Sequence, residues 1–144
     1  MTTIAYRDGV LASDTIMSIG GCLLGETVKI WRSKNGDLAG VCGTAAYLHA
    51  FRDWFLKGQK GAPPEAKVDD DCMDRGVIFR KDGRIEVYEE GGMFEVTAPY
   101  YAAGSGRAEA CGALFAGADA EMAVRAAIEH DPHTGGKVIV LRHD

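Results

Sequence analysis

The sequence predicts an α+β domain in which antiparallel sheets carry helices on their outer faces. Two pairs of β-forming segments flank turns of the Asp-Gly type, at Asp8-Gly9 and Asp82-Gly83, and such turns are strong hairpin signals. One amphipathic helical segment lies between these hairpins, and two more precede a final β-forming segment. This order favours antiparallel layers with helices outside. At 144 residues the chain is expected to fold as one domain over residues 1–144.

The first fourteen residues are predicted to form a hairpin, because β-forming residues lie on both sides of Asp8-Gly9. The next segment, residues 15–24, contains Gly20-Gly21 and is predicted as a loop or an irregular strand. Glu26–Arg32 alternates polar and apolar residues, which indicates a further strand.

An Asn-Gly turn joins that strand to another one, predicted over Leu38–Cys42. Gly43 then interrupts the strand, and Thr44 has the side chain of a helix N-cap. We predict a helix over Ala45–Lys57, because its apolar residues form a wide stripe on one side.

The segment after this helix, Gln59–Asp71, contains two prolines and a run of aspartates and is predicted as a surface loop. Tyr101–Gly106 is predicted to lead into a helix rich in small residues. The other elements follow from the same spacing and capping signals. They are strands over Gly76–Arg80, Arg84–Tyr88, Met93–Ala98 and Lys137–Arg142, and helices over Arg107–Ala116 and Ala120–His130.

Composition argues against several classes of function. The net charge is -5 and the basic residues are scattered, so no nucleic-acid partner is expected. No apolar run approaches the roughly 20 residues of a membrane span and no secretory signal is visible, so we expect no membrane partner and a cytoplasmic location. The four cysteines lack any C-x-x-C pair, which indicates buried thiols rather than a metal site.

Thr2 is the first candidate for catalysis. It follows the initiator methionine, and aminopeptidases commonly remove a methionine that precedes a small residue. Removal of Met1 would leave Thr2 with a free α-amine beside its hydroxyl. One residue would then carry both a nucleophile and its base.

Further motifs follow in a fixed order along the chain. They are Thr2-Thr3-Ile4, Gly9-Val10-Leu11-Ala12-Ser13-Asp14, Lys29 within a predicted strand, Leu38 to Ala46 around Gly43, Gly104-Ser105-Gly106, and Asp131-Pro132-His133-Thr134-Gly135-Gly136. Their order and approximate spacing resemble the N-terminal-nucleophile (Ntn) hydrolases, and within them the proteasome β-type subunits and the bacterial HslV protease. The resemblance covers most of the chain. Thr134 stands where the proteasomal motif has serine.

The resemblance implies a four-layer αββα sandwich of two antiparallel sheets and a threonine endopeptidase activity. It also implies a homo-oligomer of stacked rings, an ATP-dependent unfoldase as partner, and a peptide or protein as substrate. No organic cofactor or catalytic metal is implied, but the resemblance leaves room for a structural monovalent or divalent cation at the Thr134-Gly-Gly turn. The chain departs from the family between Gly58 and Arg75, where the predicted loop shortens the second helix region.

Physical arguments support the implied roles of Lys29 and Asp14 in activating Thr2. An α-amine has a pKa of about 7.7 to 8.0 without perturbing neighbours. A nearby ammonium disfavours protonation of that amine, so Lys29 is expected to lower its pKa. Asp14, at the end of the adjacent predicted strand, is expected to hold Lys29 charged and oriented.

The other motif residues have equally simple rationales. The backbone N–H of Gly43, at a turn with no side chain in the way, is expected to stabilise a tetrahedral oxyanion. Ser105, Asp131 and Thr134 supply hydroxyls and a carboxylate that would position the terminal amine and relay its proton.

Strand alternation predicts a substrate pocket beside Thr2, because residues two apart share a face with Lys29 or Gly43. The lining residues predicted from this alternation are Thr27, Trp31 and Val41. Ala45, on the first turn of the predicted helix, and Met17 are expected to complete the pocket. This pocket is apolar and Trp31 limits its depth, so we expect a preference for apolar side chains before the cut bond.

Other interpretations stay open. Thr2 and Thr3 have the properties of edge-strand threonines, and Asp14 with Lys29 those of a surface ion pair. The glycine motifs are also typical of ordinary turns. Within the same fold, the chain is alternatively a catalytically inactive scaffold subunit that retains Met1, or an amidohydrolase of small amides.

Overall fold

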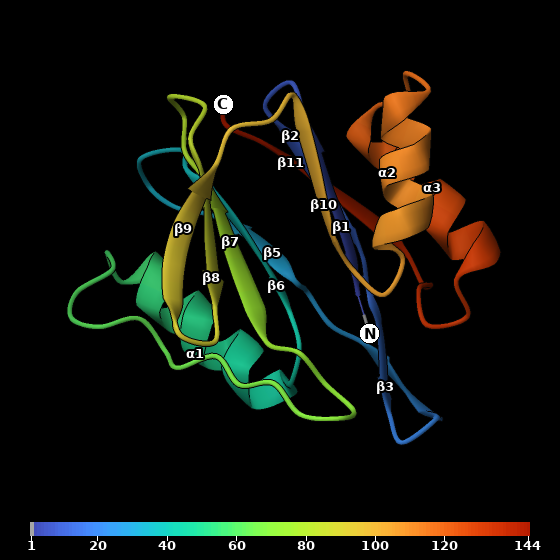
Figure 1. Cartoon of the computed structure of the whole chain (residues 1–144), viewed down its shortest axis with the longest axis horizontal. Helices are drawn as coiled ribbons and strands as arrows, with labels where there is room; N and C mark the ends of the chain where they lie inside the picture. The colour runs from blue at the N-terminus through green and yellow to red at the C-terminus, as the bar shows by residue number, and fades with distance from the viewer. Residues whose placement is uncertain (1) are drawn as a thin grey trace.

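The computed structural model describes residues 2–144 (Figure 1). Its strands are β1 (Thr3–Arg7), β2 (Val10–Asp14), β3 (Ile16–Ile19), β4 (Cys22–Glu26), β5 (Ile30–Arg32), β6 (Leu38–Cys42), β7 (Arg75–Phe79), β8 (Ile85–Glu89), β9 (Gly92–Val96), β10 (Tyr100–Gly104) and β11 (Val138–Arg142). Its helices are α1 (Ala45–Leu56), α2 (Arg107–Phe115) and α3 (Ala120–His130). The predicted α+β class is confirmed, because the strands form antiparallel sheets. One sheet has the order β10-β1-β2-β11, another has the order β5-β6-β7-β8-β9, and β3 and β4 form a separate hairpin.

The predicted first hairpin is confirmed and occupies the middle of the four-stranded sheet. β1 pairs with β2, with Ile4 opposite Ser13. Asp8 and Gly9 at the turn have φ values of 53° and 76°, the positive values that a tight hairpin turn requires. β10 pairs with the free side of β1 and β11 with the free side of β2.

Helices cover the outer faces of both sheets (Figure 1): α1 lies on the five-stranded sheet, and α2 and α3 lie on the four-stranded one. The apolar cluster beneath α1 includes Phe51, and the cluster beneath α2 and α3 includes Leu114. A third cluster joins residues of the two sheets and includes Ile4. Ala5, the next residue, packs beneath α2 and α3 instead, as expected for a strand buried on both faces.

The predicted helix caps are present. The Thr44 hydroxyl accepts a hydrogen bond from Tyr47 N at 3.2 Å, and α1 ends at Leu56, one residue before the predicted end. Asp119 caps α3 by accepting from Met122 N at 2.8 Å, and α3 has the predicted bounds. Within residues 2–144 no helix is both long and apolar enough to cross a membrane.

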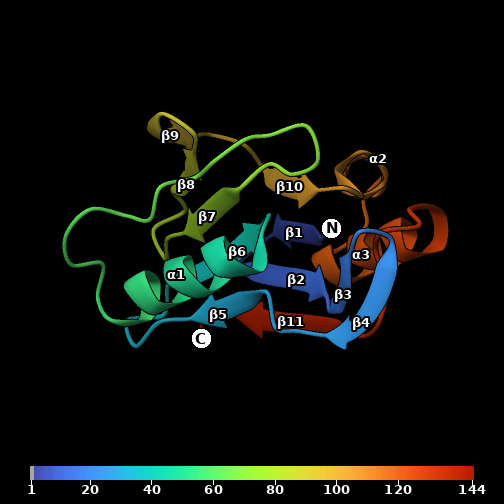
Figure 2. The ribbon, with the colours of Figure 1, turned by 90° about the horizontal axis from the view of Figure 1, so that it is seen from below.

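Three segments differ from their predictions. Residues 15–24 contribute a β-hairpin, β3–β4, which turns at Gly20-Gly21 and lies beside the start of β1 (Figure 2). The strand predicted over Glu26–Arg32 is confined to β5, and Tyr101–Gly106 contributes most of β10 instead of only leading into a helix. Such short strands are specified by their pairing partners more than by their own sequence.

The buried-thiol prediction is correct for Cys42 only. Its environment raises the pKa of its thiol to about 12, chiefly through burial. Cys22 is exposed on the β3–β4 hairpin, and Cys72 and Cys111 are half-buried. Cys72 lies in the loop of residues 59–74, which contains no helix, as the sequence predicts.

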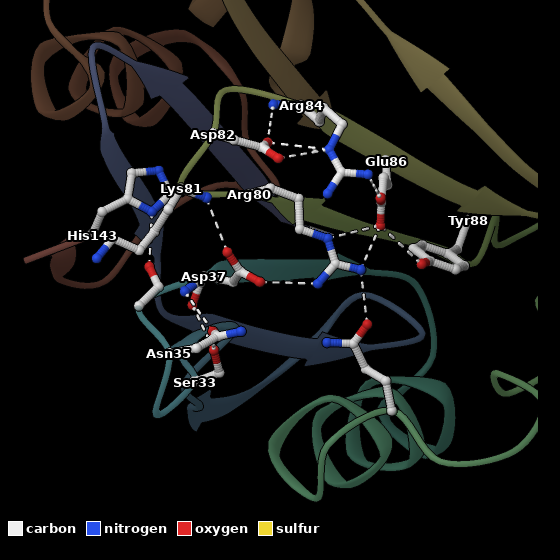
Figure 3. A network of polar contacts seen from close by, with 12 residues as sticks. Ser33, Asn35, Asp37, Arg80, Lys81, Asp82, Arg84, Glu86, Tyr88 and His143 are labelled. Carbon is white, nitrogen blue, oxygen red and sulfur yellow. Dashed lines mark hydrogen bonds and ion pairs between the residues drawn. The ribbon is translucent and has the colours of Figure 1, made fainter.

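Arg80 lies at the centre of a polar network that joins three loops (Figure 3). Its guanidinium pairs with Asp37 at 3.0 Å and with Glu86 at 2.6 Å, and it donates to the side-chain carbonyl of Gln59 at 2.8 Å. The two carboxylate side chains are only 9% and 6% exposed, so their charges need this cation, although Glu86 also has a longer pair with Arg84 at 3.5 Å. The network fastens the β5–β6 turn and the segment after α1 to the β7–β8 hairpin.

We expect Arg80→Met to lower the free energy of unfolding by about 3–5 kcal/mol, because the buried carboxylate of Asp37 loses this cation and Glu86 keeps only its longer pair with Arg84. Urea denaturation at neutral pH measures the change. The matched control is Arg125→Met, whose exposed pair with Glu121 should contribute about 0.5 kcal/mol or less. Equal losses of unfolding free energy in the two variants would contradict the role of Arg80 as the cation of the buried polar network.

Candidate functional site

Thr2 lies directly before β1, where two cavities meet. It lines a cavity of about 320 Å³ and a second one of about 270 Å³, while only 4% of its own surface is exposed. Its carbonyl accepts a hydrogen bond from Ser105 N at 2.7 Å. Gly104 permits this contact, because a Cβ there would collide with the Thr2 carbonyl. The backbone of Thr2 is therefore fixed against the end of β10.

Asp14 ends β2 and is fully buried. Its Oδ1 accepts from Lys29 Nζ at 3.1 Å and from Thr3 N at 3.0 Å, while Oδ2 accepts from Gly135 N at 3.0 Å. A buried carboxylate is tolerated when a cation and backbone amides satisfy it in this way. The predicted pair of Asp14 and Lys29 is present, and the alternative of a surface ion pair is wrong.

Lys29 is 2% exposed and lines the larger cavity together with Thr2. Burial lowers the pKa of Lys29 and outweighs the opposing attraction of Asp14. The bond to Asp14 thus fixes Lys29 in the lining of the same cavity that Thr2 borders.

Thr3 connects this pair to a second polar cluster, a role that the sequence analysis missed. Besides the bond from its N–H to Asp14, its hydroxyl lies 2.7 Å from that of Thr134 and accepts from Gly106 N at 3.1 Å. Thr3 is 0% exposed. The sequence offered one signal for this role: Thr3 is a polar residue between Thr2, the candidate nucleophile, and the apolar residues of the predicted strand.

Asp131, Ser105 and Thr134 form the second cluster, as predicted. Ser105 Oγ donates to Asp131 Oδ2 at 2.6 Å, and Thr134 Oγ1 donates to the same oxygen at 2.5 Å. Burial pushes the pKa of Asp131 up, but these hydrogen bonds and one from His133 N outweigh it, so its pKa lies below the usual value. The carboxylate is held ionised behind Ser105, whose N–H bonds to the Thr2 carbonyl.

Gly43 borders both cavities beside Thr2, at the strand-to-helix turn between β6 and α1. Its φ is 128°, and a Cβ there would collide with Asp74. Asp74 accepts from Thr44 N at 2.9 Å and thereby holds this turn, which makes it a second residue that the sequence analysis missed. The position requires glycine and leaves the backbone facing the cavities.

The larger cavity contains three of the predicted pocket residues: Met17, Thr27 and Ala45. The sequence analysis missed the other contributors, which come from the β3–β4 hairpin, the start of α1 and the loop before β7. They are Ile16, Ser18, Ile19, Gly20, Thr44, Leu48, His49, Asp71 and Cys72.

Trp31 and Val41 do not line this cavity, so their prediction as pocket residues is corrected. Both belong to the apolar cluster beneath α1, where Val41 is fully buried. The prediction assumed one continuous strand through Lys29, but β5 begins only at Ile30. Strand alternation therefore does not carry from Lys29 to Trp31.

At the Thr134-Gly-Gly turn, the backbone of Gly135 is already engaged and offers no ligand to a cation. The carbonyl of Gly135 already accepts from Thr15 N and Ile16 N, and its N–H donates to Asp14. Within residues 2–144 no group of three or more His, Cys, Asp or Glu side chains is arranged to hold a metal ion. No chemical step is assigned to a cation here.

Comparison with known proteins shows that this chain shares its fold with solved structures. No family model and no curated protein matches this sequence. Among solved structures, Thiobacillus denitrificans BPH in complex with epoxomicin is similar, with a TM-score of 0.68 and 22% identity over 99% of this chain and 98% of the other. A second structure, of Thiobacillus denitrificans BPH, gives a TM-score of 0.67 and 21% identity over 99% of this chain and 98% of the other. At this identity the likeness establishes the fold alone.

The cluster around Asp131 predicts a pH-dependent effect of Ser105→Ala. A carboxyl whose folded pKa lies below its unfolded value stabilises the fold above that unfolded value, and the contribution disappears as the pH falls through the folded pKa. We expect the variant to lose about 1–2 kcal/mol of unfolding free energy at pH 7 and less at pH 3, which lies below the unfolded value of about 3.9.

Urea denaturation at the two pH values measures this difference. Ser13→Ala is the matched control, because Ser13 Oγ donates at 2.6 Å to a backbone carbonyl, which does not titrate. A loss in Ser105→Ala that stays constant between pH 7 and pH 3 would rule out the proposed bond to an ionised carboxylate.

Proposed function

We propose that this chain is a threonine-type peptidase whose nucleophile is Thr2 Oγ, exposed with a free α-amine once the Met1–Thr2 bond is cut. Met1 itself lies outside the described residues. The observation that carries the proposal is the position of Thr2 at the meeting point of two cavities, with Lys29 lining one and Ser105 lining the other. A peptide crossing this point would present its carbonyl to the hydroxyl and extend into a cavity on each side.

The reaction needs no group beyond this chain and water. Thr2 Oγ bonds to the substrate carbonyl carbon while its proton passes to the α-amine of the same residue. The carbon–nitrogen bond then breaks, the proton goes to the leaving nitrogen, and an ester remains on Thr2. Water gives a proton to the same amine, attacks the ester and releases the acid, which restores the hydroxyl.

Two charged groups prepare the amine for this role. The buried Lys29 cation disfavours protonation of a nearby amine and thereby keeps it basic in the neutral form. Asp14 holds Lys29 at 3.1 Å and receives the N–H of Thr3 at 3.0 Å, so lysine and the start of β1 share one anchor. Ser105 and Asp131, on the other side of Thr2, orient the amine and return its proton.

The turn at Gly43 would stabilise the tetrahedral intermediate. Its backbone borders both cavities next to Thr2, and no side chain intervenes. A fixed N–H at this position favours the negative oxygen of the intermediate more than the neutral carbonyl of the substrate.

The residues that line each cavity indicate which cavity accepts the side chain before the cut bond. The larger cavity is bordered by apolar groups that include Met17, Ala45 and Leu48. We assign it to the acyl side of the substrate and expect a preference for apolar residues there. Two open cavities favour a peptide over a small amide, because a peptide extends on both sides of the bond that is cut.

The family assignment is part of the same proposal. The outer helices and the two packed sheets support a four-layer αββα sandwich of the N-terminal-nucleophile hydrolase type. The structural neighbour that holds epoxomicin supports a protease-like site on this fold. We extend the proposal to a ring-shaped homo-oligomer of the proteasome and HslV kind with an ATP-dependent unfoldase, which electron micrographs of the purified protein would test.

A peptide epoxyketone tests the proposal directly, because its ketone and epoxide carbons can react with a hydroxyl and an amine on adjacent carbons. We expect the protein with an exposed Thr2 to gain the full mass of the reagent, with the adduct on the N-terminal residue, as intact-mass and peptide-mass measurements would show. Thr2→Ser should react and Thr2→Ala should not.

Thr97→Ala, at an exposed position after β9, is the matched threonine control and should react like wild type. An unmodified protein with a free Thr2, or an adduct on Thr2→Ala, would contradict the proposal. Complete retention of Met1 would favour the scaffold alternative.

A further inference from the structure

We infer that the smaller cavity beside Thr2 binds a carboxylate on the leaving segment of the substrate, an inference that rests on the proposed peptidase function. This cavity, called the arginine cavity below, has a volume of about 270 Å³ and is lined by Arg75 and Arg107 together with Thr2, Ser105 and the loop before β7. The two guanidinium groups come from elements that are far apart in the sequence, the first residue of β7 and the first residue of α2.

Arg107 has donors available for a ligand, and Arg75 adds a second guanidinium to the cavity lining. Arg107 is exposed, and its Nη1 donates to the carbonyl of Gly104 at 3.0 Å. A guanidinium carries five N–H groups in a planar fork that fits a carboxylate, so this one contact leaves most donors of Arg107 unused. Arg75 Nη2 pairs with Glu89 at 2.8 Å and its Nε is buried, so Arg75 contributes mainly through its charge.

Proton transfer identifies the arginine cavity as the leaving side. The nitrogen that departs must receive the proton that the Thr2 amine took from the hydroxyl. Ser105, which with Asp131 would orient that amine, lines the arginine cavity but not the larger one. Lys29 and the apolar pocket residues line the larger cavity, which leaves the arginine cavity for the residues after the cut bond.

Asp71 limits the preference of the arginine cavity for a carboxylate. It is exposed in the loop before β7 and borders both cavities. Its carboxylate opposes a second carboxylate at the boundary between the cavities and partly offsets the two arginines. Removal of this charge should therefore strengthen the preference that the arginines create.

The carboxylate has two sources in a peptide. It is either the side chain of Asp or Glu directly after the cut bond, or the free carboxyl terminus of a short leaving segment. The first would make the protein an endopeptidase that cuts before acidic residues, and the second would make it an enzyme that trims short pieces from the C-terminal end of a peptide.

Three peptides distinguish these sources. They share an acylated Leu before the cut bond and continue with Glu-Ala-amide, Gln-Ala-amide or Gln-Ala with a free carboxylate. For the protein with an exposed Thr2, we expect kcat/KM to be about tenfold higher for at least one carboxylate peptide than for the neutral one, as a charge-assisted hydrogen bond provides. Equal values for all three peptides would overturn the inference while leaving the peptidase proposal intact.

Arg107→Gln is the primary variant, because Arg107 is exposed and its loss should not disturb folding. We expect the ratio of kcat/KM for the carboxylate peptide to kcat/KM for the neutral peptide to fall toward one in this variant. In Asp71→Asn the same ratio should rise by roughly threefold, as expected for the removal of one partly screened charge. Arg125→Gln, which removes an exposed cation of α3, is the matched control and should keep the wild-type ratio. An unchanged ratio in Arg107→Gln would also overturn the inference.

A binding measurement keeps the inference testable if no peptide is cleaved. The leaving-segment peptides Glu-Ala-Ala-amide, Gln-Ala-Ala and Gln-Ala-Ala-amide are titrated by calorimetry into wild type and Arg107→Gln. Tighter binding of a carboxylate peptide than of the neutral amide in wild type, lost in the variant, supports the arginine cavity as a carboxylate site. Equal binding of the three peptides rejects it, whatever the outcome of the epoxyketone reaction.

Discussion

The carboxylate of Asp14 is the constraint on which the rest of this structure depends. It is fully buried at the end of β2, and its charge is tolerated only because Lys29 and two backbone amides, of Thr3 and Gly135, surround it. Those donors come from the segment before β5, the start of β1 and the turn after α3. One side chain thereby fixes the mutual positions of three elements, and with them the position of Thr2.

A second buried carboxylate completes the arrangement from the other side. Asp131 receives the hydroxyls of Ser105 and Thr134, and Thr3 joins Thr134 at 2.7 Å, so the two anionic centres share one connecting residue. Networks of this kind rigidify a site when every member is satisfied. Gly104 allows the end of β10 to approach the Thr2 carbonyl closely, and Gly43 borders both cavities without a side chain, so Thr2 lines two cavities although its surroundings are rigid.

Much of the fold was accessible from the sequence, because turns and helix caps are local signals. The hairpin at Asp8-Gly9 and the helix capped by Asp119 depend on neighbours within a few residues, and both are confirmed. The prediction for Trp31 failed because alternation is a property of a regular strand, and the chain before Ile30 is not one. The arginine cavity was not foreseen, because only tertiary structure brings Arg107 beside the loop before β7.

The central claim is that a buried cation lowers the pKa of the amine that activates its own hydroxyl. The most direct measurement is the pH dependence of the rate at which a peptide epoxyketone modifies Thr2, compared between wild type, Lys29→Arg and Lys29→Met. Loss of the cation should raise the pKa of the amine, so the acidic limb of the profile should move up by about one pH unit or more in Lys29→Met and stay near the wild-type position in Lys29→Arg. A Lys29→Met protein that reacts with the wild-type pH profile would contradict the account.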